Sequence, residues 1–318
     1  MSIKSFSSHS NVLKFVPLPA ILFLGICVST ASAQLIHRYS FTTDGSDSVG
    51  GPTYNLTPVN NLANPITFTG GQAQLNNPNF SGPGVVENYL WYQNSPSILP
   101  AGNSMTVEQW FTFTGSGFFT ESYAFSDNAE DNNPPGQTNG QYLMQAISAP
   151  QPASPPGGAN TGGSHVAQAL NGYQGGSETD AFETTPGLGA GGGGYLDDGG
   201  TYMMATVIDG TAGTLSYYLY RTSDGLGGLQ QSITAIPLSS YNFTDLYLGR
   251  SPFLGDNATS GMIDEFRIYG DAQSASQIAA DEAAGPDVVG VPEPSSIVLA
   301  ALGLFGLVAA RSRKARAA

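Results

Sequence analysis

The segment GMIDEFRIY, residues 261–269, is the stretch of the chain that indicates its fold most strongly. Its aromatic and aliphatic residues favour a β-strand, in which successive side chains point to opposite faces. This alternation predicts that Asp264 shares a face with Phe266 and caps a nearby loop. Glu265 and Arg267 then lie together on the other face, where we expect an ion pair on the protein surface.

The residues on either side of this segment predict a strand before it and a helix after it. Residues 245–250, with the sequence DLYLGR, are typical of a strand that a loop connects to the segment. Residues 271–284 predict a short helix. Ser274 and Gln277 have the spacing of a capping box, and Gly285 is a suitable helix terminator.

Further strands are expected towards the N-terminus, because short runs of aromatic and β-branched residues alternate with turns rich in Gly, Asn, Asp and Pro. The expected strands cover residues 35–41, 65–69, 72–75, 104–114, 142–147, 202–208 and 214–222. The last two flank Asp209-Gly210, a pair typical of a hairpin turn. The pattern therefore predicts an all-β domain.

One long segment does not fit this pattern. Residues 150–200 consist mainly of Gly, Pro, Ala, Ser and Asn, and include four consecutive glycines at 191–194. Such a composition buries too little apolar surface to offset the entropy lost on ordering. We expect most of this segment to be a mobile, Gly/Pro-rich excursion from the domain.

The order of these elements resembles that of laminin-G-like, concanavalin A-like jelly-roll domains. The resemblance rests on YSF at 39–41, MTVEQWF at 105–111, the hairpin at 209–210, YLG at 247–249 and IDEFRIY at 263–269 with its trailing helix. It implies an all-β, concanavalin A-like two-sheet jelly-roll sandwich over residues 34–285. The chain departs from the family pattern at residues 126–200.

The charge of the domain restricts its partners. Residues 34–290 contain no lysine, and their 23 acidic residues against four arginines give a formal charge of −19. A nucleic acid needs a basic surface opposite its phosphates, so we exclude it as a partner. The single cysteine, Cys27, lies in the leader described next, which leaves the domain without a disulfide or a thiolate nucleophile.

Residues 1–33 have the pattern of a secretory signal peptide. An apolar run at 15–28 follows basic residues, and Ala31 and Ala33 occupy the small-residue positions of a cleavage site. We expect cleavage after Ala33. The alternative is a lipoprotein box that ends at Cys27, although a bulky isoleucine precedes that cysteine where a small residue is required.

A short linker, residues 286–290, leads to a C-terminal segment at 291–318 that has three unlike parts. These are the motif Pro292-Glu293-Pro294, an apolar run at 297–310, and a basic cluster that includes Arg311 and Arg313. As a helix, the apolar run would be about 21 Å long, which is short of the ~30 Å hydrocarbon core of a bilayer. The basic end is expected in the cytoplasm.

This order of parts resembles the PEP-CTERM sorting tail of exported bacterial proteins. The resemblance implies that an exosortase-type membrane protease recognises the tail, and that the C-terminal helix anchors the protein only until processing. The implied location is the cell envelope, the cell surface or the extracellular space, commonly together with extracellular polysaccharide. A plain C-terminal anchor that is not cut is the alternative.

No set of residues in the domain has the pattern of a catalytic site, and we expect a protein that is not an enzyme. Some concanavalin-like folds are glycosidases, which need two carboxyl groups facing one cleft. Asp264 and Glu265 are adjacent on a strand, so they point to opposite faces and do not form such a pair. His37 and His165 give neither a zinc cluster nor a Ser-His-Asp triad.

Acidic residues on the loops of an exported β-domain are candidate ligands for Ca²⁺, which prefers oxygen. The candidates are Asp44 and Asp47 in the first polar turn, Asp256 in the loop before residues 261–269, and Asp264. The alternative for each is turn formation, because Asp side chains accept hydrogen bonds from nearby backbone amides. No other cofactor is expected.

Aromatic residues are the second candidate binding feature. Trp91 and Tyr92 belong to the sequence YLWY at 89–92. Exposed rings on a sheet stack on the faces of sugars, whereas buried rings are part of the core. The sequence therefore suggests a non-catalytic surface or matrix protein that binds polysaccharide. A purely structural matrix or adhesion protein and a glycoside hydrolase are the alternatives.

Overall fold

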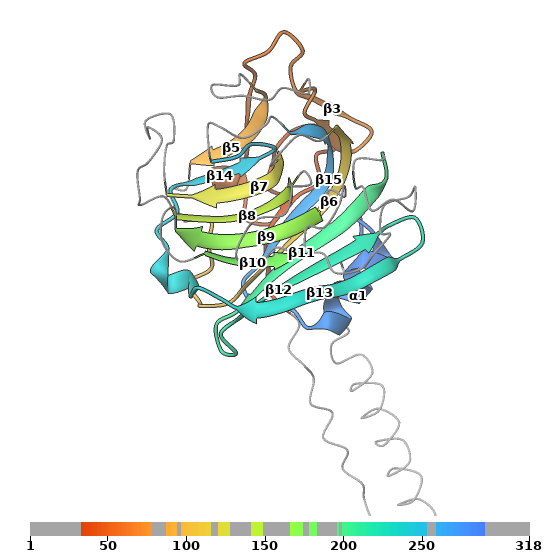
Figure 1. Ribbon diagram of the computed structural model, residues 1–318. Helices are drawn as coiled ribbons and strands as arrows, with labels where there is room; N and C mark the ends of the chain where they lie inside the picture. Colours follow the sequence, from red (N-terminus) through yellow and green to blue (C-terminus); the bar gives the residue numbers. More distant parts are fainter. Residues whose placement is uncertain are drawn as a thin grey trace, which may run out of the picture. The chain divides into compact units, whose positions relative to one another are not determined.

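Two antiparallel β-sheets pack against each other in the computed structural model of the protein (Figure 1). The structure describes residues 33–77, 87–93, 97–115, 120–127, 141–148, 166–173, 178–182, 196, 199–252 and 259–289. These residues confirm the expected all-β, two-sheet sandwich.

Sheet A has eight strands. They are β1 (Leu35–Tyr39), β3 (Thr67–Thr69), β4 (Gln72–Gln74), β6 (Met105–Gly115), β11 (Thr201–Asp209), β12 (Thr214–Arg221), β13 (Leu226–Thr234) and β15 (Ser260–Tyr269). The spatial order is β13-β12-β11-β6-β15-β4-β3, and β1 also pairs with β15. The first strand of the chain therefore lies beside the last.

Sheet B has seven strands. They are β2 (Thr57–Val59), β5 (Tyr89–Gln93), β7 (Thr120–Ser126), β8 (Gln141–Ser148), β9 (Val166–Tyr173), β10 (Glu178–Phe182) and β14 (Asp245–Leu248). Their spatial order is β10-β9-β8-β7-β14-β5-β2. Within the described residues, the helical elements are the 3-10 turns η1 (Pro52–Tyr54) and η3 (Leu238–Ser240) and the helix α1 (Ala275–Ala284).

Aromatic side chains from both sheets fill the space between them. The ring of Tyr123 on β7 lies 5.5 Å from the ring of Phe266 on β15, and both are fully or almost fully buried. Burial of one such side chain contributes about 1.5–3 kcal/mol to stability. The period-2 pattern of the strands therefore produces the core because each sheet directs its apolar face towards the other.

Strand β15 contains the segment GMIDEFRIY, pairs with β6 on one side and with β1 and β4 on the other, and contains a β-bulge. The register with β6 shifts between Ile263 and Glu265, so Asp264 is the extra residue. A bulge reverses the alternation of side chains. Ile263 and Phe266 consequently both belong to the core. Asp264 does not share the face of Phe266 as predicted, and instead accepts a 3.1 Å hydrogen bond from Gln72.

The helix α1 begins and ends as the sequence predicts. The Ser274 hydroxyl accepts from the amide of Gln277, and the Gln277 side chain accepts from the amide of Ser274, which is a capping box. Gly285 ends the helix with a φ of 85°. Ile278 is fully buried in a cluster with Trp110. The helix therefore covers part of the outer face of sheet A.

Strands β9 and β10 lie within residues 150–200, and the expectation that most of this segment is a mobile excursion stays a prediction. β9 pairs with β8 along its whole length, and β10 pairs with β9. Pairing of backbone amides and carbonyls orders a strand whatever its side chains are, because each paired group is then satisfied. Most of the other residues between 150 and 200 lie outside the described part.

The predictions for the two ends of the chain fall mostly outside the described residues. Only Ala33 of the leader is described, and the sorting residues Pro292, Glu293, Pro294, Arg311 and Arg313 and the cleavage residue Ala31 are not. Among the residues that the structure describes, no helix is long and apolar enough to cross a membrane. Cleavage after Ala33 stays a prediction.

Candidate functional site

The two residues predicted to contact a glycan, Trp91 and Tyr92, lie on opposite faces of β5. Tyr92 is only 5% exposed and belongs to the core, where its ring lies 5.8 Å from that of Tyr54. This placement corrects the prediction for Tyr92, since a ring inside the sandwich does not meet a ligand. Trp91 is partly exposed on the outer face, where its Nε1 donates to Asp245 Oδ1 at 2.8 Å.

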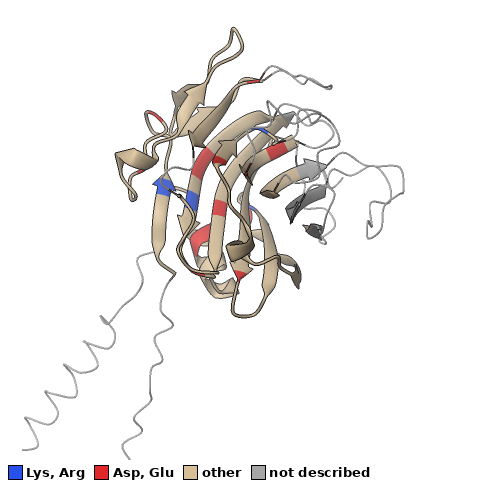
Figure 2. Cartoon of the chain, turned by 90° about the vertical axis from the view of Figure 1, so that its left-hand side faces the viewer, with Lys and Arg blue, Asp and Glu red and all other residues tan. Residues whose placement is uncertain are grey.

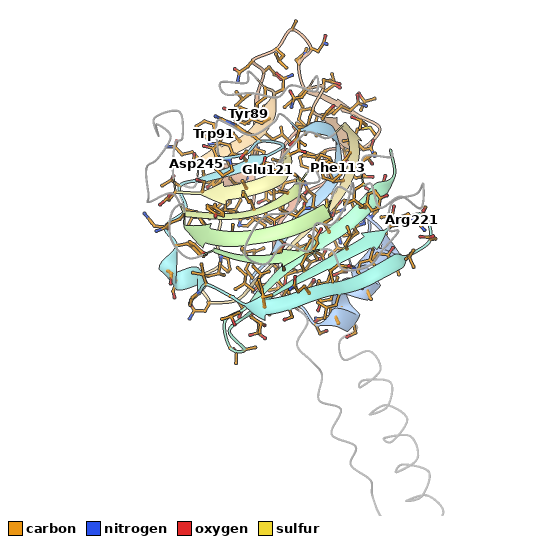
Figure 3. All side chains as sticks on the ribbon, in the orientation of Figure 1. Tyr89, Trp91, Phe113, Glu121, Arg221 and Asp245 are labelled. Atoms are coloured by element: carbon orange, nitrogen blue, oxygen red, sulfur yellow. The ribbon has the colours of Figure 1, made fainter. Side chains whose placement is uncertain are left out.

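Aromatic and charged side chains gather around Trp91, and we name this cluster the aromatic face. Its members are Tyr89 and Trp91 on β5, Asp245 and Tyr247 on β14, and Glu87 and Arg250 next to these strands. Trp91 and Tyr247 are direct partners in the strand register. Figure 3 shows Tyr89, Trp91 and Asp245 in the same part of sheet B.

The guanidinium group of Arg250 organises the aromatic face. Its central carbon lies 4.7 Å from the ring centre of Tyr89 and 5.3 Å from that of Tyr247. The two rings meet edge to face at 5.8 Å, and Arg250 Nε lies 3.2 Å from Glu87 Oε1. Cation–π and edge-to-face contacts both favour one arrangement of the rings. The cluster is therefore a rigid aromatic surface.

This surface has the chemical features that sugar recognition requires. Tyr89 and Trp91 are partly exposed, whereas Arg250 and Tyr247 keep only 8% and 5% of their surface accessible. Partly exposed rings offer an apolar platform. Asp245 is only 5% exposed, and its two carboxylate oxygens accept from Trp91 and Thr244, so it holds the Trp91 ring in place. The arrangement has no nucleophile with an adjacent base, the pairing that covalent catalysis uses.

Every arginine between residues 34 and 290 is described, and each is paired with a carboxylate. The pairs are Arg38–Glu265 (2.6 Å), Arg221–Asp224 (2.6 Å), Arg250–Glu87 (3.2 Å) and Arg267–Glu265 (2.5 Å). Figure 2 shows basic positions next to acidic ones on the strands. This part of the chain therefore presents no unpaired arginine to an anionic polymer.

Among the calcium candidates, Asp47 has both carboxylate oxygens occupied by the protein. Its Oδ1 accepts from the amides of Arg38, Val49 and Gly50, and its Oδ2 lies 2.5 Å from Nδ1 of the buried His37. Burial raises the pKa of Asp47, but these hydrogen bonds outweigh it and hold the pKa below the usual range. Asp47 thus forms the first turn.

The other calcium candidates are held by different groups. Asp44 Oδ1 accepts from the amide of Ser46 at 2.9 Å, which is an Asx turn. Asp264 is bonded to Gln72, as described above, and Asp256 lies outside the described residues. Among the described side chains, no three His, Cys, Asp or Glu residues come together as metal ligands. Calcium binding stays a prediction.

Glu265 and Arg267 do form an ion pair, but the pair is buried and not on the surface as predicted. Both side chains are fully buried. The guanidinium of Arg267 lies 4.5 Å from the ring centre of Trp110. The carboxylate of Glu265 also binds Arg38. The two-residue spacing of Glu265 and Arg267 on a strand predicts that their side chains are neighbours. It does not predict that other parts of the chain bury the pair.

Glu108 on β6 is a buried acid for which the sequence suggested no role. Its Oε2 accepts a 3.1 Å hydrogen bond from the Tyr269 hydroxyl and lies 3.7 Å from Arg267 Nη1. Burial, reinforced by the neighbouring Asp281, raises the pKa of Glu108 well above its usual range despite the opposing effect of Arg267. This cluster joins sheet A to α1, which carries Asp281.

The fold and these clusters define an antiparallel two-sheet sandwich with an apolar core and a cluster of arginine, glutamate and aromatic side chains on the outer face of each sheet. The C-terminal residues 290–314 match the model of the PEP-CTERM protein-sorting motif. This match confirms the sorting tail predicted from the sequence. The motif implies an exported protein that an exosortase processes at the cell surface. No curated protein matches the chain.

Several solved structures resemble the sandwich at low identity. Domain 4 of AbnA, an extracellular GH43 arabinanase from Geobacillus stearothermophilus solved with arabinotriose, has 20% identity and a TM-score of 0.43 over 78% of this chain and 98% of its own. The binding domain of botulinum neurotoxin DC has 13% identity and a TM-score of 0.45 over 78% and 50% of the two chains. NanB sialidase from Streptococcus pneumoniae has 16% identity and a TM-score of 0.43 over 66% and 27%.

Proposed function

We propose that this protein is a non-catalytic surface or extracellular-matrix protein whose concanavalin A-like sandwich binds polysaccharide through the aromatic face. The sorting motif supports delivery to the cell surface. The observation that carries the binding proposal is the pair of partly exposed rings, Tyr89 and Trp91, fixed beside the carboxylate of Asp245 and the guanidinium of Arg250.

The charges of the domain favour a neutral polysaccharide over an anionic one. Residues 34–290 have a formal charge of −19, and each arginine among them is already paired with a carboxylate. An anionic polymer would meet like charge without an unpaired arginine to compensate it, and such juxtaposition costs free energy. A neutral glycan needs only stacking and hydroxyl hydrogen bonds.

The proposal is tested with the secreted protein and its Trp91→Ala variant in affinity electrophoresis against neutral and uronate-rich polysaccharides. Loss of one stacking ring costs roughly 0.5–1.5 kcal/mol, so we expect the affinity for the neutral polymer to fall by up to about tenfold. The matched control is Leu229→Ala, because Leu229 is 51% exposed on β13 of the other sheet. It should bind like the native protein.

Three outcomes would contradict the proposal. Absence of binding to any polysaccharide would favour the purely structural matrix protein. Equal losses for Trp91→Ala and Leu229→Ala would remove the aromatic face as the site. Release of reducing sugar from a bound polymer would show a hydrolase, the class that we propose against.

A further inference from the structure

The chain does not leave the sandwich where α1 ends, because two arginines hold the next four residues by their backbone. The acceptors are the carbonyl oxygens of Gly285 (3.4 Å), Pro286 (2.5 Å) and Val288 (3.0 Å) for Arg267 Nη2, and of Asp287 (3.2 Å) for Arg38 Nη2. Residues 286–288, which we expected to be part of a linker, are therefore attached to the folded sandwich.

Glu265 fixes the two arginines that make these contacts. Its Oε1 accepts from Nε of Arg38 at 2.6 Å and from Nε of Arg267 at 2.5 Å, and its Oε2 accepts from Nη2 of Arg38 at 3.0 Å. Hydrogen bonds between charged groups are about twice as strong as neutral ones. We name Arg38, Glu265 and Arg267 the carbonyl clasp. It exists only when β1 and β15 are paired, since they supply its members.

The clasp lies directly before the sorting motif in the chain. The matched motif begins at residue 290, and only residues 289–291 separate the last clasped carbonyl from Pro292. Four Cα steps at 3.3–3.6 Å give a reach of about 14 Å from Val288 to Pro292. If the clasp opened, the free chain would begin after α1, and the reach would be about twice as long.

We propose that the carbonyl clasp restrains the sorting tail, so that folding of the sandwich holds the Pro-Glu-Pro motif close to the domain and slows its processing by the exosortase. A membrane protease must fit its substrate motif into its own active site, and a folded domain within about 14 Å obstructs that approach. Release of the segment gives the protease a longer, extended substrate. This inference rests on the sorting assignment and not on polysaccharide binding.

Gly285 offers a way to open the clasp without removing a buried charge. Its backbone has φ 85° and ψ 178°, a region that is essentially restricted to glycine, and an added Cβ would meet nothing within 4 Å. Gly285→Ala therefore strains the path of the chain into the clasp without a collision. The matched control is Gly51→Ala, because Gly51 has φ 86° and ψ −179° and equally open surroundings in another turn.

A spacer provides an independent route to the same effect. Six Gly/Ser residues inserted between Val289 and Gly290 lengthen the tether and leave the clasp intact. The same six residues inserted in the exposed hairpin turn after Thr211 serve as the control, because that turn is exposed and joins β11 to β12. Neither insertion changes a member of the clasp.

The experiment follows the full chain in an exosortase-containing host by pulse-chase, measuring conversion of the full-length to the shorter form. We expect Gly285→Ala and the tail spacer to be processed several-fold faster than the native chain, and both controls at the native rate. Purified Gly285→Ala should also be cut faster than Gly51→Ala by a protease that cleaves before valine, at Asp287–Val288.

Processing of all four variants at the native rate, or slower processing of Gly285→Ala and the tail spacer, would overturn the clasp as a restraint. Equal protease resistance of Gly285→Ala and Gly51→Ala would show that the segment stays attached, and a native rate for the tail spacer would then decide against the proposal. If the native chain is not processed at all, the sorting assignment itself fails, which is a different result.

Discussion

The outer face of each sheet carries an arginine that packs against aromatic rings and pairs with a glutamate. The two clusters differ in how far they are buried. On sheet A, Arg267 lies over Trp110, is fully buried and is bound by backbone carbonyls. On sheet B, Arg250 lies over two tyrosines with partly exposed rings around it. The cluster on sheet A is therefore buried, whereas the similar cluster on sheet B has partly exposed rings.

Cover, and not composition, distinguishes the structural cluster on sheet A from the surface on sheet B that we propose to bind polysaccharide. Arg267 donates hydrogen bonds from Nε and Nη2 to its own chain, so it stabilises the fold. On sheet B, Tyr89 and Trp91 still have accessible surface, whereas Tyr247 is buried. Two substitutions and one titration test this distinction.

The largest effect is expected from Arg267→Met compared with Arg250→Met. Removal of Arg267 takes the cation partner from the buried Glu108 and leaves Glu265 with Arg38 alone. Breaking a buried pair in this way costs about 3–5 kcal/mol of unfolding free energy. Removal of Arg250 leaves Glu87, which keeps 11% of its side chain exposed, and the loss should be about 1–3 kcal/mol. Urea unfolding of the secreted proteins measures both. Equal losses would show that the two clusters are equally structural.

A second effect is expected in the pH dependence of the closed cluster. The pKa of Glu108 is raised in the folded protein, first by burial and then by Asp281. The folded state therefore holds this proton more tightly than the unfolded state does. Its stabilising effect is complete below the ordinary glutamate pKa of about 4.3 and is lost as the pH rises towards the folded pKa.

The Glu108→Gln variant tests this sign. Glutamine keeps an acceptor for the Tyr269 hydroxyl and does not titrate, so the decline in unfolding free energy above about pH 4.3 should become shallower. Asp224→Asn is the control, because Asp224 lies in an exposed turn. A slope in Glu108→Gln equal to that of the native protein would contradict the burial argument.

The smallest effect is expected from calcium. A site with a millimolar dissociation constant, which is typical of extracellular modules, adds about 1.4 kcal/mol of unfolding free energy at a tenfold excess of the ion. Thermal melting in excess calcium and in EDTA measures it, with magnesium as the control ion. Identical melting temperatures in calcium and EDTA would remove the prediction.

The sequence identified the elements whose side-chain pattern is locally complete. The capping box at Ser274 and Gln277 and the strand at residues 261–269 are examples, since their signals lie within one short segment. The strand β9 was missed because it is ordered by pairing with β8, and no residue within β9 records that pairing.

The candidate site was predictable only in part, for a related reason. Trp91 and Tyr92 are both aromatic and adjacent in the sequence. Tyr92 is buried and Trp91 is partly exposed because only one face of β5 packs against the other sheet. Arg250 and Glu87 also belong to the site, but they are far apart in the sequence and only the fold brings them together. The bulge at Asp264 reversed the alternation of β15, and a bulge of one residue leaves no compositional signal.

The pairing of β1 with β15 has a consequence for the time at which the protein folds. Leu35 pairs with Tyr269, and the amide of Gly270 donates to the carbonyl of Gln34 at 2.8 Å. The first strand of the sandwich thus pairs with the last one before sheet A is complete. Contacts this distant in sequence form slowly. Completion of the sandwich therefore requires the whole chain from β1 to the end of β15.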